Sequence, residues 1–142
     1  MPKFLHDEVA QKERKTIYLS PSEASYLGLP ESEDLPLHIS LKYFDGSYEC
    51  FSEWQRGELK AFTNFIDKLR EHNWERVRRT PGFGYTEHNR QHLPRKRILT
   101  LISPDTTLFE LRVTQKARVH GFKVQSVFFL VWLDRNHEIY RQ

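Results

Sequence analysis

A group of basic side chains recurs along the last third of the chain at spacings of two and four residues: Arg112, Lys116, Arg118 and His120. Alternate residues of a β-strand lie on one face of its sheet, so Lys116, Arg118 and His120 are expected to point the same way. An arginine can bind two phosphate oxygens at once, and a histidine can serve as general acid or base near neutral pH. These residue types suit metal-free cleavage of RNA, in which a 2′-hydroxyl attacks the neighbouring phosphate.

Two further candidates lie near the end of the chain, His137 and Tyr140. Tyrosine can stack on a base or move a proton. The two residues are three positions apart, so in a straight strand they would face opposite sides. They converge only if one of them lies in a turn or the strand twists. The candidate catalytic residues are therefore Arg112, Arg118, His120, His137 and Tyr140.

Charge is distributed unevenly along the chain. The formal net charge is +3, but residues 1–75 carry −5 and residues 76–142 carry +8. A basic half indicates an anionic partner, and RNA is the partner that suits the chemistry above. The alternative is that sheet-rich segments carry lysine and arginine as solubilising edge residues. The candidate RNA-binding residues are Lys116, Arg78, Arg79, Arg95, Lys96 and Arg97.

Composition narrows the class of protein. Cys50 is the single cysteine, so no internal disulfide is possible and a reducing compartment is expected. The apolar run 127–133 is far shorter than the roughly 20 residues of a membrane-spanning helix, and the polar N-terminus is unlike a secretory signal. We predict a cytoplasmic protein. His88 and His92 have a spacing that binds zinc on a helix, but no helix is predicted there, and we expect neither metal nor cofactor.

The elements that must position these residues follow from periodicity. Alternation over 37–43 predicts a strand, and Asp45-Gly46 predicts a hairpin turn into 48–51. A capping box at Ser52 and Gln55 and an apolar stripe predict a helix over about 53–72.

After a long basic loop, a β-meander is expected at 109–113, 116–124 and 126–133, with a short last strand at 137–140. Gly121 predicts a bulge. The fold class is therefore α+β, with one helix packed on a twisted, mostly antiparallel sheet. Residues 1–36 are expected to be an N-terminal extension and residues 37–142 a single domain.

This order of elements resembles the RelE/ParE toxin superfamily over residues 37–142, ending in "FELRV", "KARVHGFKV", "SVFFLVWL" and "HEIY". The resemblance places Arg118 on the superfamily's most recurrent arginine, Arg112 on the arginine of its preceding strand, and the C-terminal segment on "DRNHEIY". It implies a small toxin whose RelE branch cleaves messenger RNA, usually on the ribosome, with a cognate antitoxin as partner. Here about 35 residues separate the helix from the next strand, where the superfamily usually has a short connection.

The resemblance thus implies a RelE-like toxin of a toxin–antitoxin pair that acts as a metal-independent endoribonuclease. The alternative is a non-catalytic nucleic-acid- or protein-binding module of the same fold. Individual residues also have structural alternatives. Arg118 could brace the sheet through a carboxylate such as Glu110, His120 could be an ordinary strand residue, and His137 could cap the turn after Asp134. Tyr140 could serve packing alone.

Overall fold

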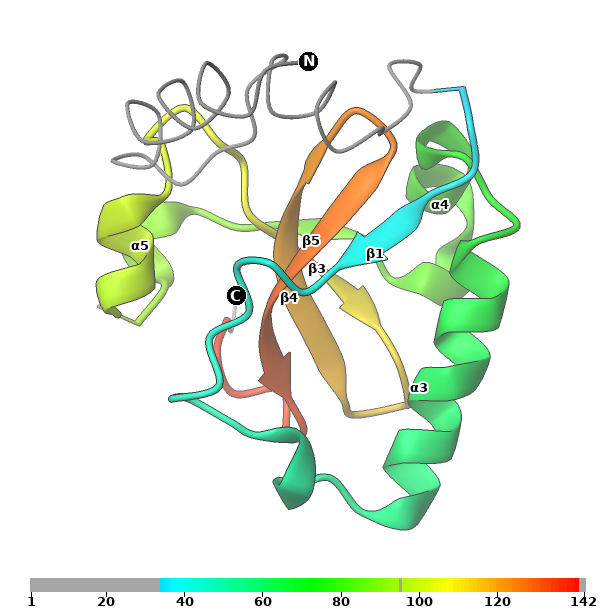
Figure 1. The fold of residues 1–142 in the computed structure, drawn as a ribbon, viewed down its shortest axis with the longest axis horizontal. Coiled ribbons are helices and arrows are strands. Elements are labelled where there is room, and N and C mark those ends of the chain that lie inside the picture. Colours follow the sequence, from blue (N-terminus) through cyan, green and yellow to red (C-terminus); the bar gives the residue numbers. More distant parts are fainter. Residues whose placement is uncertain (1–33, 95, 141–142) are drawn as a thin grey trace, which may run out of the picture.

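A five-stranded mixed sheet forms the centre of the molecule (Figure 1). The computed structural model describes residues 34–94 and 96–140, so all but the last three residues of the predicted extension lie outside it. The strand order is β1-β5-β4-β3-β2, and the strands are β1 (His38–Ser40), β2 (Thr86–Glu87), β3 (Phe109–Arg112), β4 (Arg118–Val124) and β5 (Val127–Asp134). Only β1 is parallel to its neighbour β5; the other pairs are antiparallel. The predicted α+β class is confirmed.

One face of the sheet is covered by the amphipathic helix α3 (Arg56–Leu69), which buries Phe62, Phe65 and Leu69. The prediction that this helix begins at about 53 was wrong. The segment Phe51–Glu53 is a separate 3-10 turn, η2, whose Glu53 carboxylate accepts the N–H of Cys50 at 2.6 Å. The capping box of α3 lies one turn later, where Glu58 accepts the N–H of Gln55 at 2.7 Å.

The other face of the sheet is covered by Leu93, Ile98, Leu99 and Ile102 of the segment between α3 and β3, whereas Val77 and Phe83, earlier in that segment, pack in the cluster under α3. The sequence indicated a long loop there, but the structure contains short elements: α4 (Trp74–Arg79), η3 (Pro81–Phe83), β2, η4 (Arg90–His92) and α5 (Arg97–Leu101). Leu93 and Ile102 from this segment pack with Phe129 and Val131 of β5. Figure 1 shows α3 and α5 on opposite sides of the sheet. Every residue of β5 is consequently buried.

The predicted irregularity at Gly121 is confirmed. The register between β4 and β5 shifts between His120 and Gly121, and Val131 on β5 has no partner in the ladder. A Cβ atom at Gly121 would lie 2.0 Å from the backbone oxygen of Phe129, so only glycine fits this approach. The extra residue puts Val131 and Trp132 in the same apolar cluster, as a bulge does.

Two predicted strands are wrong. Residues 48–51 form no hairpin, because the Asp45 carboxylate caps its own turn through Ser47 and also accepts the indole N–H of Trp132 at 3.0 Å. Residues 137–140 form no strand, because the Asp134 carboxylate captures the backbone N–H groups of Glu138 and Ile139. The strand predicted at 37–43 is limited to three residues. In the described part of the chain, no helix has the length and apolar character needed to cross a bilayer.

Candidate functional site

A chain of three buried ionisable side chains crosses the sheet at the end where β5 finishes. The Asp134 Oδ2 atom lies 2.7 Å from Nε2 of His120, and Nδ1 of His120 lies 2.7 Å from Nε2 of His88. His120 is fully buried, while Asp134 is 1% and His88 9% exposed. The three residues come from β5, β4 and the loop after β2, so only the folded chain brings them together.

The direction of these hydrogen bonds follows from Asp134. Burial acts to raise the pKa of this carboxyl, but hydrogen bonds from His120 and from the N–H groups of Glu138 and Ile139 outweigh it and lower the pKa. An ionised carboxylate only accepts, so Nε2 of His120 carries a proton. In the tautomer with the proton on Nε2, Nδ1 of His120 accepts from Nε2 of His88.

His88 ends this chain with an unpaired atom. Burial lowers the pKa of His88 to about 3, so the ring is neutral at physiological pH. Its Nδ1 is buried and has no hydrogen-bond partner among the described residues. The ring stacks on Tyr140 with centroids 4.1 Å apart, and the Tyr140 hydroxyl accepts the N–H of Asn89 at 3.1 Å.

A second buried polar group lies on the neighbouring strand. Glu110 on β3 is 3% exposed, and its carboxylate lies 3.2 Å from Nε of Arg118 and 2.9 Å from Nε2 of His137. The terminal NH1 of Arg118 donates to three backbone carbonyls of the β3–β4 turn, those of Thr114, Gln115 and Ala117. Arg118 therefore braces the turn and holds Glu110 in place.

An open pocket of about 650 Å³ lies above Glu110. Its lining consists of Thr86, Glu110, Gln115, Lys116, Asn136, His137 and Tyr140. His137 and Tyr140 both reach it because His137 sits in the turn after β5, in the left-handed region at φ 55°. Lys116 is exposed, and the His137 side chain is 35% exposed. The pocket therefore offers an ammonium and an imidazole to a ligand.

The structure separates the residues singled out in the sequence into three groups. Lys116, His137 and Tyr140 line the pocket, and Arg118 and His120 lie buried beneath it. Arg112 is exposed and lies beside Gly84 in a different hollow. The remaining cations lie on other elements: Arg78 and Arg79 on α4, and Lys96 and Arg97 at the start of α5, whereas Arg95 lies outside the described residues.

Sequence reasoning did not single out His88 and Asp134 as members of the site, and it named Glu110 only as a possible brace. His88 and His120 are 32 residues apart, and nothing in the spacing of either points to the other. Asp134 gave one signal, because it directly ends the buried run of β5 and precedes His137 in the same turn. An acid at the end of a fully buried strand needs donors nearby.

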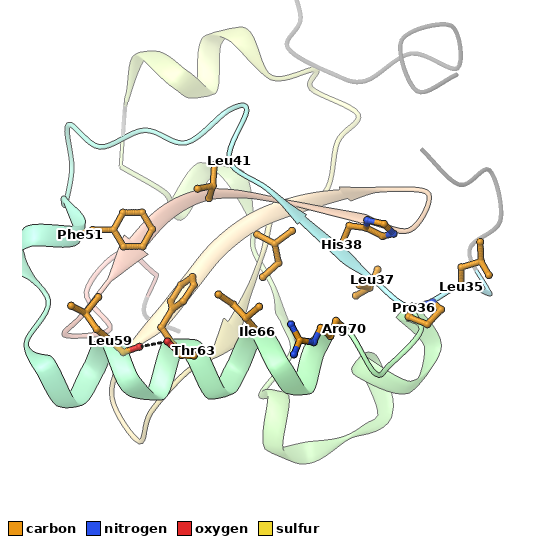
Figure 2. Close-up of a pocket in the computed structure, with 12 residues that line it drawn as sticks. Leu35, Pro36, Leu37, His38, Leu41, Phe51, Leu59, Thr63, Ile66 and Arg70 are labelled. Carbon is orange, nitrogen blue, oxygen red and sulfur yellow. Dashed lines mark hydrogen bonds between the residues drawn. The ribbon is translucent and has the colours of Figure 1, made fainter. Parts of the chain in front are cut away.

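A larger hollow, an apolar groove of about 890 Å³, lies between α3 and β1 (Figure 2). Leu59 and Ile66 of α3 face Leu37 and Leu41 across it, with Arg70 at one end. Nine of its twelve lining residues are aliphatic or aromatic, and the polar members are His38, Thr63 and Arg70. A groove of this composition can hold an apolar surface.

Three residues of the buried network could hold a metal ion. One ligating atom from each of His88, Glu110 and His120 lies within 4.8 Å of the other two. Two imidazoles and a carboxylate are a donor set that binds zinc and related transition-metal ions. The spacing of His88 and His92 plays no part, because His92 is not a member of this group.

Comparison with known proteins gives one similar structure. No protein-family model matches the sequence, and no curated protein matches it. A chain in the crystal structure of the archaeal RelE-RelB complex from Pyrococcus horikoshii OT3 is similar over 74% of this chain and 97% of that chain, at 16% identity and a TM-score of 0.43. A similarity at this level does not assign a function, so the proposal below rests on the residues of the site.

Proposed function

We propose that this protein is a RelE-like toxin that cleaves RNA, without a metal ion, in the pocket lined by Lys116, His137 and Tyr140. The observation that carries the proposal is the convergence of these three side chains on one open pocket, with Glu110 beneath them. Phosphodiester cleavage needs a group that accepts the 2′-hydroxyl proton, a cation for the phosphate oxygens and a donor for the departing 5′-oxygen. The pocket contains one candidate for each.

His137 is the proposed general base. The Glu110 carboxylate accepts from Nε2 of His137 at 2.9 Å, which fixes the ring and leaves Nδ1 to take the proton of the 2′-hydroxyl. This arrangement is the same pairing of a histidine with an orienting carboxylate that activates nucleophiles in other enzymes. Attack of the 2′-oxygen on phosphorus then breaks the bond to the 5′-oxygen and yields a cyclic phosphate and a 5′-hydroxyl.

Lys116 is the proposed phosphate-binding cation, and Tyr140 is the proposed general acid. Lys116 is exposed at the rim, where its ammonium can bind the non-bridging phosphate oxygens. The Tyr140 hydroxyl already accepts the N–H of Asn89, so its own proton remains to be donated toward the 5′-oxygen. Arg118 and His120 are buried and hydrogen-bonded within the protein, so in this proposal they position Glu110 and the pocket floor.

The proposal includes two partners. Messenger RNA, free or on the ribosome, would extend from the pocket over the basic surface residues, with Arg78, Arg79, Lys96, Arg97 and Arg112 as predicted contacts beyond the pocket. A cognate antitoxin would neutralise the protein by covering the pocket. Both partners follow from the sequence resemblance and from the cations around the site.

Primer extension on a defined messenger RNA, with and without ribosomes and in the presence of EDTA, tests the proposal. His137→Asn keeps a residue that tolerates the left-handed backbone but cannot exchange a proton, so it should reduce cleavage by about 10²–10⁴-fold. His38→Asn, at an exposed position on β1, is the matched control and should cleave as the wild type does. Cleavage that survives in His137→Asn would overturn the assignment.

The burial of Arg118 and His120 favours a second candidate function, a binding module without catalysis. Arg118 and His120, which are among the side chains best suited to catalysis, then contribute to the stability of the fold alone. Such a module would leave RNA intact in every lane and lose affinity gradually as exposed cations are removed. Its binding would also weaken steeply with salt. Discrete cuts that vanish in His137→Asn would exclude this reading.

A further inference from the structure

The buried network beneath the pocket has the donor set and orientation of a metal site. His88 and His120 direct two ring nitrogens at each other, Nε2 and Nδ1, at 2.7 Å. One ligating atom from each of His88, His120 and Glu110 lies within 4.8 Å of the other two. These residues come from the loop after β2, from β4 and from β3, so an ion held by them would tie three segments together.

The second ring nitrogen of His120 is fixed in the way that metal-binding histidines require. Its Nε2–H donates to Asp134, and Asp134 is itself held by the N–H groups of Glu138 and Ile139. This places the lone pair of His120 on Nδ1, toward His88. A carboxylate behind a histidine in this manner orients the ring and strengthens it as a ligand.

His88 supplies an independent observation. It is 9% exposed, its Nδ1 has no hydrogen-bond partner among the described residues, and its Nε2 is occupied only by His120. If the His88 proton moves from Nε2 to Nδ1, both of the facing nitrogens have a free lone pair, and the net charge is unchanged. A metal ion can then bind between the two rings, in the place that the proton has left.

We propose that His88, His120 and Glu110 form a binding site for a divalent transition-metal ion of the zinc type, through Nε2, Nδ1 and one carboxylate oxygen. Three protein ligands leave a fourth position open, as in sites that keep a water or exogenous ligand. Zinc–nitrogen bonds of about 2.0–2.1 Å in a tetrahedral site separate two nitrogens by roughly 3.3 Å, so the rings must move apart by about 0.6 Å. His88 lies in the loop after a two-residue strand, where such a shift is feasible.

Glu110 belongs both to the lining of the pocket and to the proposed metal site. The proposed RNA cleavage uses Lys116, Tyr140 and His137, which Glu110 orients, and it needs no metal, so the ion would serve to tether His88 and its loop to the sheet. The inference therefore goes beyond the proposed function and does not depend on it.

Titration of the full-length, tag-free protein with Co²⁺ after dialysis against EDTA tests the site. Wild type should bind one Co²⁺ per chain with the visible ligand-field absorption of a low-coordinate site, and Zn²⁺ should displace it and raise the Tm. His88→Gln should weaken binding at least 10-fold. The matched control is His92→Gln, four residues along the same segment, which should bind as the wild type does. Glu110→Gln is a second variant, and circular dichroism checks that each variant is folded.

Absence of the Co²⁺ absorption in wild type, or unchanged affinity in His88→Gln, would overturn the metal site and leave the two rings as a hydrogen-bonded pair. RNA cleavage measured on the same preparations separates this outcome from failure of the proposed function. Cleavage in EDTA by a protein that binds no Co²⁺ overturns the metal site alone. Co²⁺ binding by a protein that never cuts RNA supports the metal site and overturns the cleavage.

Discussion

The two faces of the sheet bury their residues by different means. The face under α3, here called the helix face, packs Phe128, Leu130 and Leu133 of β5 in one apolar cluster with Phe62, Phe65 and Leu69 of the helix. The opposite face is apolar only in part. Toward the end of β5 it carries a polar group, here called the histidine end: His88, Glu110, Arg118, His120 and Asp134.

The two faces differ in how much of the free energy of unfolding depends on a single side chain. On the helix face, each residue contributes its own buried area, and neighbours remain satisfied when one is removed. At the histidine end, several groups depend on one shared partner. Asp134, for example, accepts from His120, Glu138 and Ile139. Removing it leaves all three donors without an acceptor in a buried place.

The largest expected effect is that of Asp134→Ala. This change should lower the free energy of unfolding by about 3–5 kcal/mol, because it breaks a buried ionic hydrogen-bond network and strands His120 and two backbone N–H groups. Urea unfolding followed by circular dichroism measures the loss. Asp105→Ala, at an exposed position, is the control and should change stability by less than about 0.5 kcal/mol. A loss below about 1 kcal/mol in Asp134→Ala would remove the distinction between the two faces.

A somewhat smaller loss is expected on the helix face. Leu130 is fully buried in the cluster under α3, and Leu130→Ala should cost about 2–4 kcal/mol through lost transfer free energy and an incompletely collapsed cavity. The same urea titration should give the same loss at pH 5 and at pH 8, because Leu130 packs within an apolar cluster. A loss that varies by more than about 1 kcal/mol between these pH values would show that the two faces are coupled.

The third effect is the pH dependence that His88 contributes to stability. The pKa of His88 is lowered to about 3 in the folded state, so its contribution to stability is complete above the unfolded value of 6.5 and is lost as pH falls from there toward 3. The slope in that window should approach about 1.4 kcal/mol per pH unit. The lowered pKa of Asp134 adds a further loss below its ordinary value of 3.8.

His88→Gln isolates this effect, because glutamine cannot take up a proton in the unfolded chain. The variant should be less stable than wild type at pH 7, and its stability should change little between pH 6.5 and pH 4.5. His38→Gln, exposed on β1, should retain the slope of the wild type. An undiminished slope in His88→Gln would place the titrating group elsewhere.

The helix face was also the part of the fold that could be predicted from the sequence. The 3.6-residue apolar stripe of α3, the three meander strands and the irregularity at Gly121 all come from local spacing, and the structure contains them. The histidine end could be predicted only in part. Its residues occur at 88, 110, 118, 120 and 134, and their pairing depends on a register between strands that no local pattern encodes.

The wrong prediction of a strand at residues 137–140 has the same origin. Residues 137–140 have a pattern compatible with a strand, but the Asp134 carboxylate takes their backbone donors and bends the chain away. That one interaction removed a strand and, by placing His137 in a turn, also brought His137 and Tyr140 to one pocket. A side chain that accepts backbone hydrogen bonds competes with the ladder, and the sequence does not show which of the two wins.

The smallest effect is expected where an arginine–glutamate pair lies in water. Arg79 and Glu75 on α4 form an ion pair at 2.8 Å, but their side chains are 79% and 67% exposed, against 8% and 4% for Arg118 and Glu110. Arg79→Ala should therefore change the free energy of unfolding by less than about 0.5 kcal/mol, and 1 M salt should abolish even that change.

The same variant should weaken RNA binding measurably at low salt if α4 contributes to the RNA surface, because removal of one phosphate contact lowers the salt slope by about one. Unchanged stability together with weaker RNA binding would show that Arg79 contributes to RNA binding and not to stability, whereas the buried pair of Arg118 and Glu110 stabilises the fold. A loss above about 1 kcal/mol would mean that the exposed pair contributes to stability through contacts other than its charge.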